Sequence, residues 1–326
     1  MSDECAIIGQ KTMTANQMPI SQSDMRSVLK NALTLMKPYT WFASAWAFVV
    51  GCVASHSIYF DLGAGGDIGR SVLSVGRIAI GTLLAGPLLV GFSQVWNDWC
   101  DRDVDAINQP ERLIPSGKAT KSQVYAVVVA LGVAALAVAL FLGPQVMLVA
   151  ALGLFLAIIY SAEPLKLKKN GWIGNLAVGL AYESFAWISG HLTFDPALHS
   201  AGATQSIVLA LVYGLGAHGI MTINDFKSVA GDRQMGLRSI PAMYGEGLAA
   251  KIAVATIVAA QVVAIVLQLV WGHWLPALIC IVFMLAQVRA QMQLIQTPTQ
   301  PMAVRYNLVA IPPFVWAMLV AAIGLN

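Results

Sequence analysis

The sequence has little charge. Only 11% of its 326 residues are Asp, Glu, Lys or Arg, whereas 58% are hydrophobic and the mean hydropathy is +0.71. Soluble domains carry about 25% charged and about 45–50% apolar residues, so a soluble globule and a disordered chain are both excluded. The formal net charge of +3 is too small to indicate a nucleic-acid partner. The composition therefore predicts a protein that crosses the membrane many times.

Cysteine is also scarce and dispersed. The residues Cys5, Cys52, Cys100 and Cys280 form no CxxC pair, so neither a disulfide framework nor a zinc site is indicated. No early apolar run occurs in the first 39 residues, and a cleaved signal peptide is therefore not expected.

Long apolar runs fill most of the chain. Each is long enough to cross a hydrocarbon core of about 30 Å as a helix, and the predicted fold class is an all-α membrane protein with nine transmembrane helices. The nine runs are 40–60, 75–96, 122–142, 144–160, 171–192, 204–223, 248–271, 274–293 and 305–325. Two connections, at 143–144 and 271–274, are so short that the spans they join should form helical hairpins.

Lysine and arginine fall almost entirely on one side of this arrangement. Of the 19 basic residues, 17 lie in the N-terminal arm, in connections or at span ends on the same side, and only Arg70 and Arg77 lie on the other. The positive-inside rule places the N-terminus in the cytoplasm and, after nine spans, the C-terminus in the periplasm. Two units are expected, a cytoplasmic arm over 1–39 and a nine-helix domain over 40–326. Within the arm, residues 24–37 have helical apolar spacing, which fits either a helix on the membrane surface or one packed on the protein.

An acidic motif follows the second span. Its carboxylates, Asp98, Asp101 and Asp105, are spaced i, i+3, i+7 behind Asn97, which places them on one face of a helix. Three carboxylates on one stripe repel one another unless a cation lies among them. Oxygen ligands without His or Cys favour Mg²⁺. A solvated acidic loop is the alternative for a single motif of this kind.

A second motif follows the sixth span and is predicted to face the same compartment. It begins Asn224-Asp225 and continues to Asp232. Two such clusters can bracket a diphosphate through bridging Mg²⁺, and the usual two-metal pattern predicts a pair of ions. The candidate catalytic carboxylates are Asp98, Asp101, Asp225 and Asp232, and the candidate metal ligands are these four with Asn97, Asp105 and Asn224.

Basic side chains flank both motifs and are candidate partners for phosphate oxygens. They are Arg102, Arg112, Lys166, Lys227 and Arg233. The positive-inside bias alone also explains each of them. Tyr160 is a further candidate for the diphosphate site, or an ordinary interfacial anchor.

Four sequence strings resemble those of a known protein family. They are KPYTWF (37–42), NDWCDRDVDAINQPERLIPSG (97–117), YSAEPLKLKKNGW (160–172) and NDFKSVAGDRQMGLRSIP (224–241). The chain resembles the UbiA-type intramembrane prenyltransferases and, within them, the chlorophyll and bacteriochlorophyll synthases over residues 37–326. Cys100 favours the bacteriochlorophyll branch. Leu113 stands where the family pattern has Pro, and Glu163 adds a charge where the family has a neutral residue.

The resemblance implies esterification of the propionate of bacteriochlorophyllide a by geranylgeranyl or phytyl diphosphate. It assigns Mg²⁺ and diphosphate to both Asn-Asp motifs, in a bacterial inner membrane with the active site on the cytoplasmic side. Other pigment-synthesis or light-harvesting assembly proteins are candidate partners. The implied acceptor is a carboxylate that is already ionised, so no general base is required.

Three interior residues are candidates of a different kind. His218 lies six residues before Asn224 and could ligand the central magnesium of a tetrapyrrole, and Trp99 could stack on the macrocycle; a hydrogen-bonded core histidine and an interfacial anchor are the alternatives. Glu183 is the one carboxylate well inside a predicted span, where it is structural or functional.

Other functions fit the same features less well. A UbiA-type enzyme with chlorophyllide, a quinone precursor or haem as acceptor would share both motifs. A transporter would need polar groups along the whole path, whereas the charges here lie at one face. A chlorophyll-binding scaffold would not need seven paired Asn and Asp positions.

Overall fold

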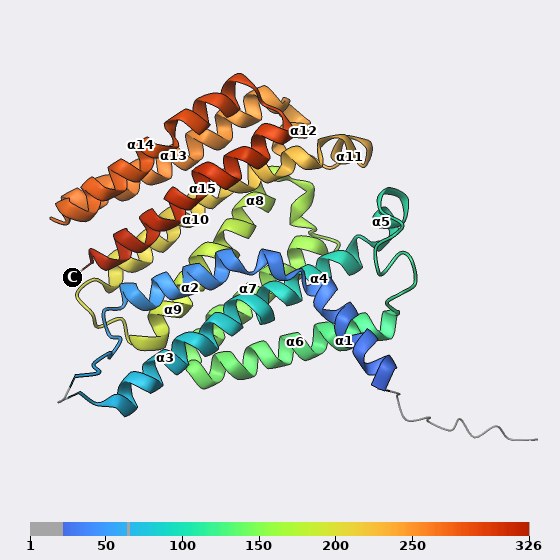
Figure 1. Ribbon diagram of the computed structural model, residues 1–326. Helices are drawn as coiled ribbons and strands as arrows, with labels where there is room; N and C mark the ends of the chain where they lie inside the picture. The colour runs from blue at the N-terminus through green and yellow to red at the C-terminus, as the bar shows by residue number, and fades with distance from the viewer. Residues whose placement is uncertain (1–21, 64–65, 326) are drawn as a thin grey trace, which may run out of the picture.

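The computed structural model describes residues 22–63 and 66–325, and every regular element in these ranges is a helix (Figure 1). The predicted arm over 1–39 lies largely outside the described residues, as do Cys5 and Lys11. Asn170 and Arg238 form one isolated parallel bridge. The all-α prediction is therefore confirmed for the part of the chain that the structure describes.

Seven helical segments in the described ranges are long and apolar enough to cross a membrane. They are Ile68–Cys100 (α3, Ile68–Leu83; η2, Leu84–Val90; α4, Gly91–Cys100), α6 (Lys121–Leu142), α7 (Pro144–Ser161), Ala203–Lys227 (α10, Ala203–Asn224; η5, Asp225–Lys227), α13 (Glu246–Val270), α14 (Trp274–Gln296) and α15 (Gln300–Ile323). The remaining two predicted spans coincide with the shorter α2 (Phe42–Ala54) and with α8 (Gly171–Gly179), η4 (Leu180–Ser184) and α9 (Phe185–Phe194). A total of nine crossings, and the side on which each terminus lies, stay predictions.

Both predicted hairpins are present, and local chemistry explains them. Gly143 ends α6 with a φ of 154°, and Pro144 begins α7, where a helix needs no amide donor. Gly272 turns the chain between α13 and α14 with a φ of 86°. Thr120 and Gln123 form a capping box at the start of α6, which satisfies two backbone donors.

Two spans contain a π-helical segment. In η2, Pro87 lies inside the helix and removes a backbone donor. In η4, Leu180–Ser184 interrupts the helix that α8 and α9 otherwise form. Such segments change the direction in which side chains point and occur often at functional sites. Both contribute residues to the cavity described below.

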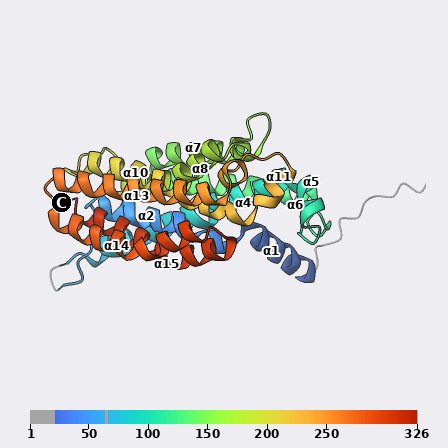
Figure 2. The same cartoon turned by 90° about the horizontal axis from the view of Figure 1, so that it is seen from above.

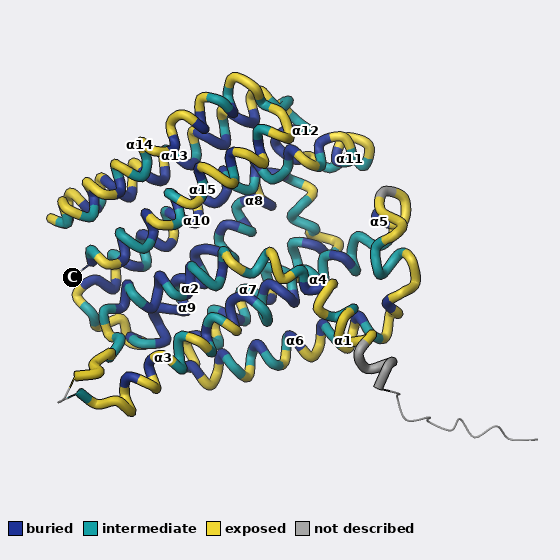
Figure 3. The backbone as a smooth tube through the Cα atoms, in the orientation of Figure 1, coloured by how far each residue is buried: buried dark blue, intermediate teal, exposed yellow. Residues whose placement is uncertain are grey.

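The outer surface of the bundle is largely apolar. Figure 3 shows exposed positions along the outward faces of α6, α13 and α14, and the exposed side chains there include Val133, Val266 and Leu285. In water such a surface would be a large apolar patch; in lipid it is the expected one. Figure 2 shows the long helices lying alongside one another, with α1 projecting from the end that carries α5.

Helix α1 (Gln22–Met36) was expected either to lie on the membrane surface or to pack on the protein, and it has features of both. Its C-terminal residues Leu35 and Met36 are buried in a cluster that includes Phe92 of α4, whereas Leu29 and Leu33 are exposed. One end of α1 therefore packs on the protein, and its exposed leucines leave an apolar surface near the start of the domain.

Three short helices gather at one end of the bundle. They are α5 (Arg102–Asn108), α11 (Val229–Gln234) and α12 (Ile240–Tyr244). Figure 1 shows α5 and α11 together at this end, while the C-terminus lies at the other. The two Asn-Asp motifs, which are far apart in sequence, are thereby placed at the same end.

Candidate active site

A cavity of about 1100 Å³ opens among α2, α4, α7, α8 and α10. Small-molecule sites usually measure about 300–1,000 Å³, so this cavity is large. Polar residues of both acidic motifs line one part of it, and apolar residues such as Phe48, Leu84 and Val149 line the rest. The cavity can therefore hold a charged head and a hydrocarbon chain at the same time.

The first motif is divided by a break in the helix. Helix α4 ends at Cys100, and Asp101 has φ −99° and ψ 3° before α5 begins at Arg102. Asp98 and Asp105 both face Arg112, at 3.7 Å and 2.7 Å. Asp101 is paired separately, with Lys168. The three carboxylates are thus close neighbours, although a local break at Asp101 divides α4 from α5 and Asp101 has a different cation partner.

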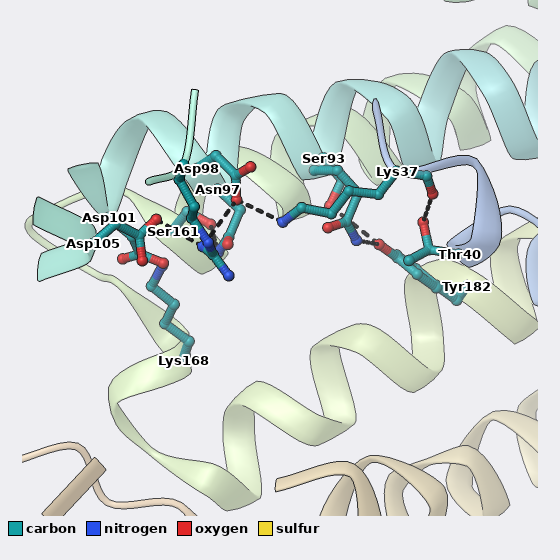
Figure 4. Close-up of polar contacts among 12 residues, drawn as sticks. Lys37, Thr40, Ser93, Asn97, Asp98, Asp101, Asp105, Ser161, Lys168 and Tyr182 are labelled. Atoms are coloured by element: carbon teal, nitrogen blue, oxygen red, sulfur yellow. Dashed lines mark hydrogen bonds and ion pairs between the residues drawn. The ribbon is translucent and has the colours of Figure 1, made fainter. Parts of the chain in front are cut away.

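Each carboxylate of this motif has a cation partner, and Figure 4 shows Lys37 and Lys168 beside the motif. Lys37 Nζ donates to Asp98 Oδ1 at 2.6 Å, and Lys168 Nζ donates to Asp101 Oδ2 at 2.6 Å. Burial lowers the pKa of the Lys168 ammonium group, and the Asp101 carboxylate opposes that shift. Burial raises the pKa of Asp105, with Arg112 acting in the opposite direction. The first motif is therefore neutralised by the protein itself.

The second motif has neutral partners instead. Asn175 Nδ2 donates to Asp225 Oδ2 at 3.1 Å, and Asn307 Nδ2 donates to Asn224 Oδ1 at 2.7 Å. Asp232 accepts hydrogen bonds from two serines, Ser228 and Ser239. No ion pair within 4.0 Å involves Asp225 or Asp232 among the described residues.

This donor set fits Mg²⁺. Asp225 and Asp232 are hard oxygen donors that face the cavity without a neutralising cation, and Mg²⁺ takes one or two carboxylates, water and substrate phosphates. Within the described ranges no three His, Cys, Asp or Glu side chains stand close enough to hold a metal by themselves. The protein alone therefore supplies an incomplete set of Mg²⁺ ligands, which phosphate oxygens of a substrate would complete.

Most of the predicted site residues line the cavity. Those that do are Asn97, Asp101, Asp105, Arg112, Tyr160, Lys166, Asn224, Asp225, Lys227 and Asp232. Asp98 lies behind them and is 6% exposed. Its ion pair orients Lys37, which does line the cavity.

Besides Asp98, four predicted residues do not line the cavity. Arg102 lies over the ring of Trp99, which packs edge-on against Tyr125. The Arg233 guanidinium donates to the carbonyl of Pro241 and is half-exposed. His218 stacks on Trp172, with ring centroids 5.4 Å apart. In each case a local partner holds the side chain away from the cavity, so the placement expected for Arg102, Arg233, His218 and Trp99 is corrected.

Sequence reasoning missed several residues of the site. Lys37 and Lys168 lie 61 and 67 residues from the carboxylates they pair with, so no local spacing reveals them. Asn175 belongs to neither motif, yet it contacts Asp225. The strings KPYTWF and YSAEPLKLKKNGW, which contain both lysines, were the available signal. Glu163 forms an exposed pair with Lys169 and takes no part in the cavity.

Comparisons with known proteins identify the family of the chain. The model of the UbiA prenyltransferase family matches residues 62–317. The chain belongs to the UbiA prenyltransferase family. Among similar proteins is the bacteriochlorophyll synthase 34 kDa chain of Chloroflexus aurantiacus, which is 43% identical over 100% of this chain and 98% of its own length. A chloroplastic chlorophyll synthase of Arabidopsis thaliana is 34% identical over 96% of this chain and 82% of its own length.

Solved structures share the fold of this UbiA family member. A UbiA homologue from Aeropyrum pernix K1 superposes with a TM-score of 0.66 at 21% identity, over 86% of this chain and 97% of that one. A UbiA homologue from Archaeoglobus fulgidus, bound to GPP and Mg²⁺, has a TM-score of 0.61 at 16% identity, over 89% of this chain and 99% of that one. The all-helical UbiA fold is thereby confirmed.

Proposed function

We propose that the protein transfers a geranylgeranyl or phytyl group from its diphosphate to the propionate of bacteriochlorophyllide a and releases diphosphate. One observation carries the proposal: two Asn-Asp motifs and several cationic side chains line one end of a cavity whose remaining wall is largely apolar. The 43% identity to a bacteriochlorophyll synthase chain over the full length supports this acceptor over the chlorophyllide of the more distant chlorophyll synthases.

The polar end of the cavity would bind the diphosphate. Lys37, Lys166 and Lys168 line it together with Arg112 and Lys227, and phosphate oxygens are natural partners for ammonium and guanidinium groups. Asp101, Asp105, Asp225 and Asp232 would hold Mg²⁺, with Asn97 and Asn224 as further oxygen donors. When bound, Mg²⁺ stabilises the negative charge on a departing diphosphate.

The chemistry balances without a general base. The bond between C1 of the prenyl chain and the diphosphate oxygen breaks, and its electron pair leaves with the diphosphate. A propionate oxygen, ionised near neutral pH, forms the new bond to C1. No proton has to move, which fits a cavity lining without a Ser-His or Cys-His pair among the described residues.

The apolar wall would hold the prenyl chain and exclude water. Leu84, Leu89 and Val90 of η2 line the cavity together with Val149 and Phe185. Water that reached the allylic cation would give a prenyl alcohol instead of an ester. The protein would lie in a bacterial inner membrane, with the polar end of the cavity on the cytoplasmic side.

The proposal is tested with purified protein, Mg²⁺ and geranylgeranyl diphosphate. The acceptors are bacteriochlorophyllide a, chlorophyllide a, haem and a phenolic quinone precursor, and the ester products are separated by chromatography. With the wild-type protein, we expect the bacteriochlorophyllide ester to form fastest. The Asp225→Asn variant is the control, and it should form no ester. Turnover of the phenolic acceptor without turnover of either chlorophyllide would contradict the proposal.

A further inference from the structure

Glu183 is a buried carboxyl group inside the cavity, with no partner of its own. It lies in the π-helical segment η4, is 8% exposed and lines the cavity. No hydrogen bond or ion pair involves its side chain among the residues that the structure describes. An unpaired polar group at this depth costs several kcal/mol, and intramembrane carboxyl groups mark functional sites by default. Glu183 lines the same cavity as both Asn-Asp motifs.

Ser44 of α2 is a second unpaired polar group of the cavity among the described residues, and it lies at the same depth as Glu183. Helices α2 and α9 touch at glycines, where a Cβ on Gly51 would meet the backbone of Trp187 and a Cβ on Gly190 would meet the backbone of Phe48. The segments that lead into α2 and into α8, η4 and α9 both start from the polar end of the cavity, where Lys37 and Lys168 pair with the first motif.

Counting back from this contact gives the level of Glu183. Seven residues, or about two helical turns, lead from Gly51 to Ser44 and from Gly190 to Glu183. Ser44 is 2% exposed, also lines the cavity, and its hydroxyl has no hydrogen-bond partner in the described structure.

The contacts of the neighbouring Tyr182 fix the depth of this pair. Gln94 Nε2 donates to the Tyr182 hydroxyl at 3.2 Å, and Ser93 lies 3.4 Å from the same oxygen (Figure 4). Gln94 lies one helical turn before Asn97. Glu183 is therefore about one to two turns deeper than the diphosphate end, next to the place where the two substrates would react.

Neither part of the prenyl diphosphate can satisfy these groups. The prenyl chain is a hydrocarbon, and the diphosphate belongs to the cationic end, where a further carboxyl group would repel it. The tetrapyrrole acceptor, in contrast, carries ketone and ester carbonyl oxygens on its ring. An unpaired carboxyl group away from water is held as the neutral acid, which has one O–H to donate.

We propose that Glu183, assisted by Ser44, donates a hydrogen bond to a ring carbonyl oxygen of the tetrapyrrole and so aims its propionate at C1 of the prenyl chain. Glu183 is then a positioning residue that selects the acceptor. This inference rests on the proposed function. It also replaces His218 as the tetrapyrrole contact, because His218 stacks on Trp172 and does not line the cavity.

The test measures KM for each substrate separately. Glu183→Leu should raise KM for bacteriochlorophyllide about tenfold, the loss of one well-placed hydrogen bond, with KM for geranylgeranyl diphosphate unchanged. Glu183→Gln keeps an N–H donor and should stay within about threefold of wild type. Ser44→Ala should raise the acceptor KM by about two- to threefold. Gln261→Leu removes an equally buried polar side chain outside the cavity and should change neither KM.

A second measurement begins with the wild-type protein, whose folding no substitution has changed. The wild-type protein is given an acceptor whose ring ketone has been reduced to a methylene group, and its KM should rise about tenfold, whereas Glu183→Leu should no longer distinguish the two acceptors. An unchanged acceptor KM in Glu183→Leu overturns the inference. So does a loss in Glu183→Gln as large as in Glu183→Leu, which would mean that the negative charge or axial ligation of magnesium is what matters. A wild-type protein that esterifies no tetrapyrrole contradicts the proposed function instead.

Discussion

The acidic motif at residues 97–105 and the one at 224–232 lie at the same end of one cavity, yet their carboxylates have different partners. Asp98, Asp101 and Asp105 are each paired with a lysine or arginine. Among the described residues, Asp225 and Asp232 have only amide and hydroxyl hydrogen-bond partners.

This difference indicates a division of labour between the motifs. The first motif holds cations in position at the cavity, where they are available to phosphate oxygens. The second carries negative charge that its neutral partners do not cancel, so it gains most from a metal ion. Together they would bind a negatively charged diphosphate and its Mg²⁺ without leaving a large net charge in the membrane.

The largest expected effect comes from removing one carboxylate from either motif. Asp101→Ala and Asp225→Ala, which line the cavity, should each lower turnover by about three orders of magnitude or more, because leaving-group stabilisation contributes several kcal/mol. Rates are measured by ester formation under saturating substrates, and helical content is checked by circular dichroism. Near-normal rates in both folded variants would contradict the assignment of both motifs to one site.

Removal of the cations that the first motif holds should affect substrate binding more than turnover. Lys37→Met and Lys168→Met should each raise KM for prenyl diphosphate about tenfold or more, the value of a hydrogen bond to a charged group. Lys169→Met is the matched control, because Lys169 adjoins Lys168 but pairs with exposed Glu163 at the surface. An equal rise in the control would mean that overall charge, not the site, is responsible.

The pH dependence should also separate the motifs. Burial lowers the pKa of Lys168, so its ammonium group is lost at a lower pH than that of an ordinary lysine. We therefore expect kcat/KM for prenyl diphosphate to fall on the alkaline side, and the fall to move to higher pH in Lys168→Arg, whose guanidinium stays charged. An alkaline limb that does not move would assign the titration to another group.

The smallest effects are expected at the basic residues that lie outside the cavity. Arg102→Ala and Arg233→Ala should leave both KM values within about twofold of wild type, since exposed ion pairs contribute little. Arg112→Ala is the contrasting variant, because Arg112 lines the cavity and bridges Asp98 and Asp105. A large loss in Arg102→Ala would show that α5 moves toward the substrate.

The helices could be predicted closely from the sequence, because each apolar run is long and bounded by turn residues. For example, 122–142 was expected where α6 spans Lys121–Leu142. The π-helical segments η2 and η4 could not be predicted, since one extra residue in a turn leaves the hydropathy unchanged. Glu183 lies in η4 and lines the cavity.

The sequence indicated which residues belong to the candidate site, but not which of them form ion pairs with one another. Both Asn-Asp motifs were visible because each is compact in sequence. The partners of Asp98 and Asp101 were not, because the bundle brings Lys37 and Lys168 from more than sixty residues away. Arg102 shows the opposite error: it adjoins the motif in sequence, yet it stacks on Trp99.

The difference between the motifs is tested most directly by the thermal stability of two isosteric variants. Tm is measured for wild type, Asp98→Asn and Asp225→Asn, each without metal and with Mg²⁺ and diphosphate. In metal-free protein we expect Asp98→Asn to melt lower than wild type, because Lys37 and Arg112 lose a buried partner. Asp225→Asn should melt at or above wild type, because an uncompensated charge is removed.

Mg²⁺ with diphosphate should raise the Tm of the wild type, since a ligand that binds only the folded state stabilises it, and should leave the Tm of Asp225→Asn nearly unchanged. Shifts of the same sign and size in both metal-free variants, with full Mg²⁺ stabilisation retained in Asp225→Asn, would contradict the account.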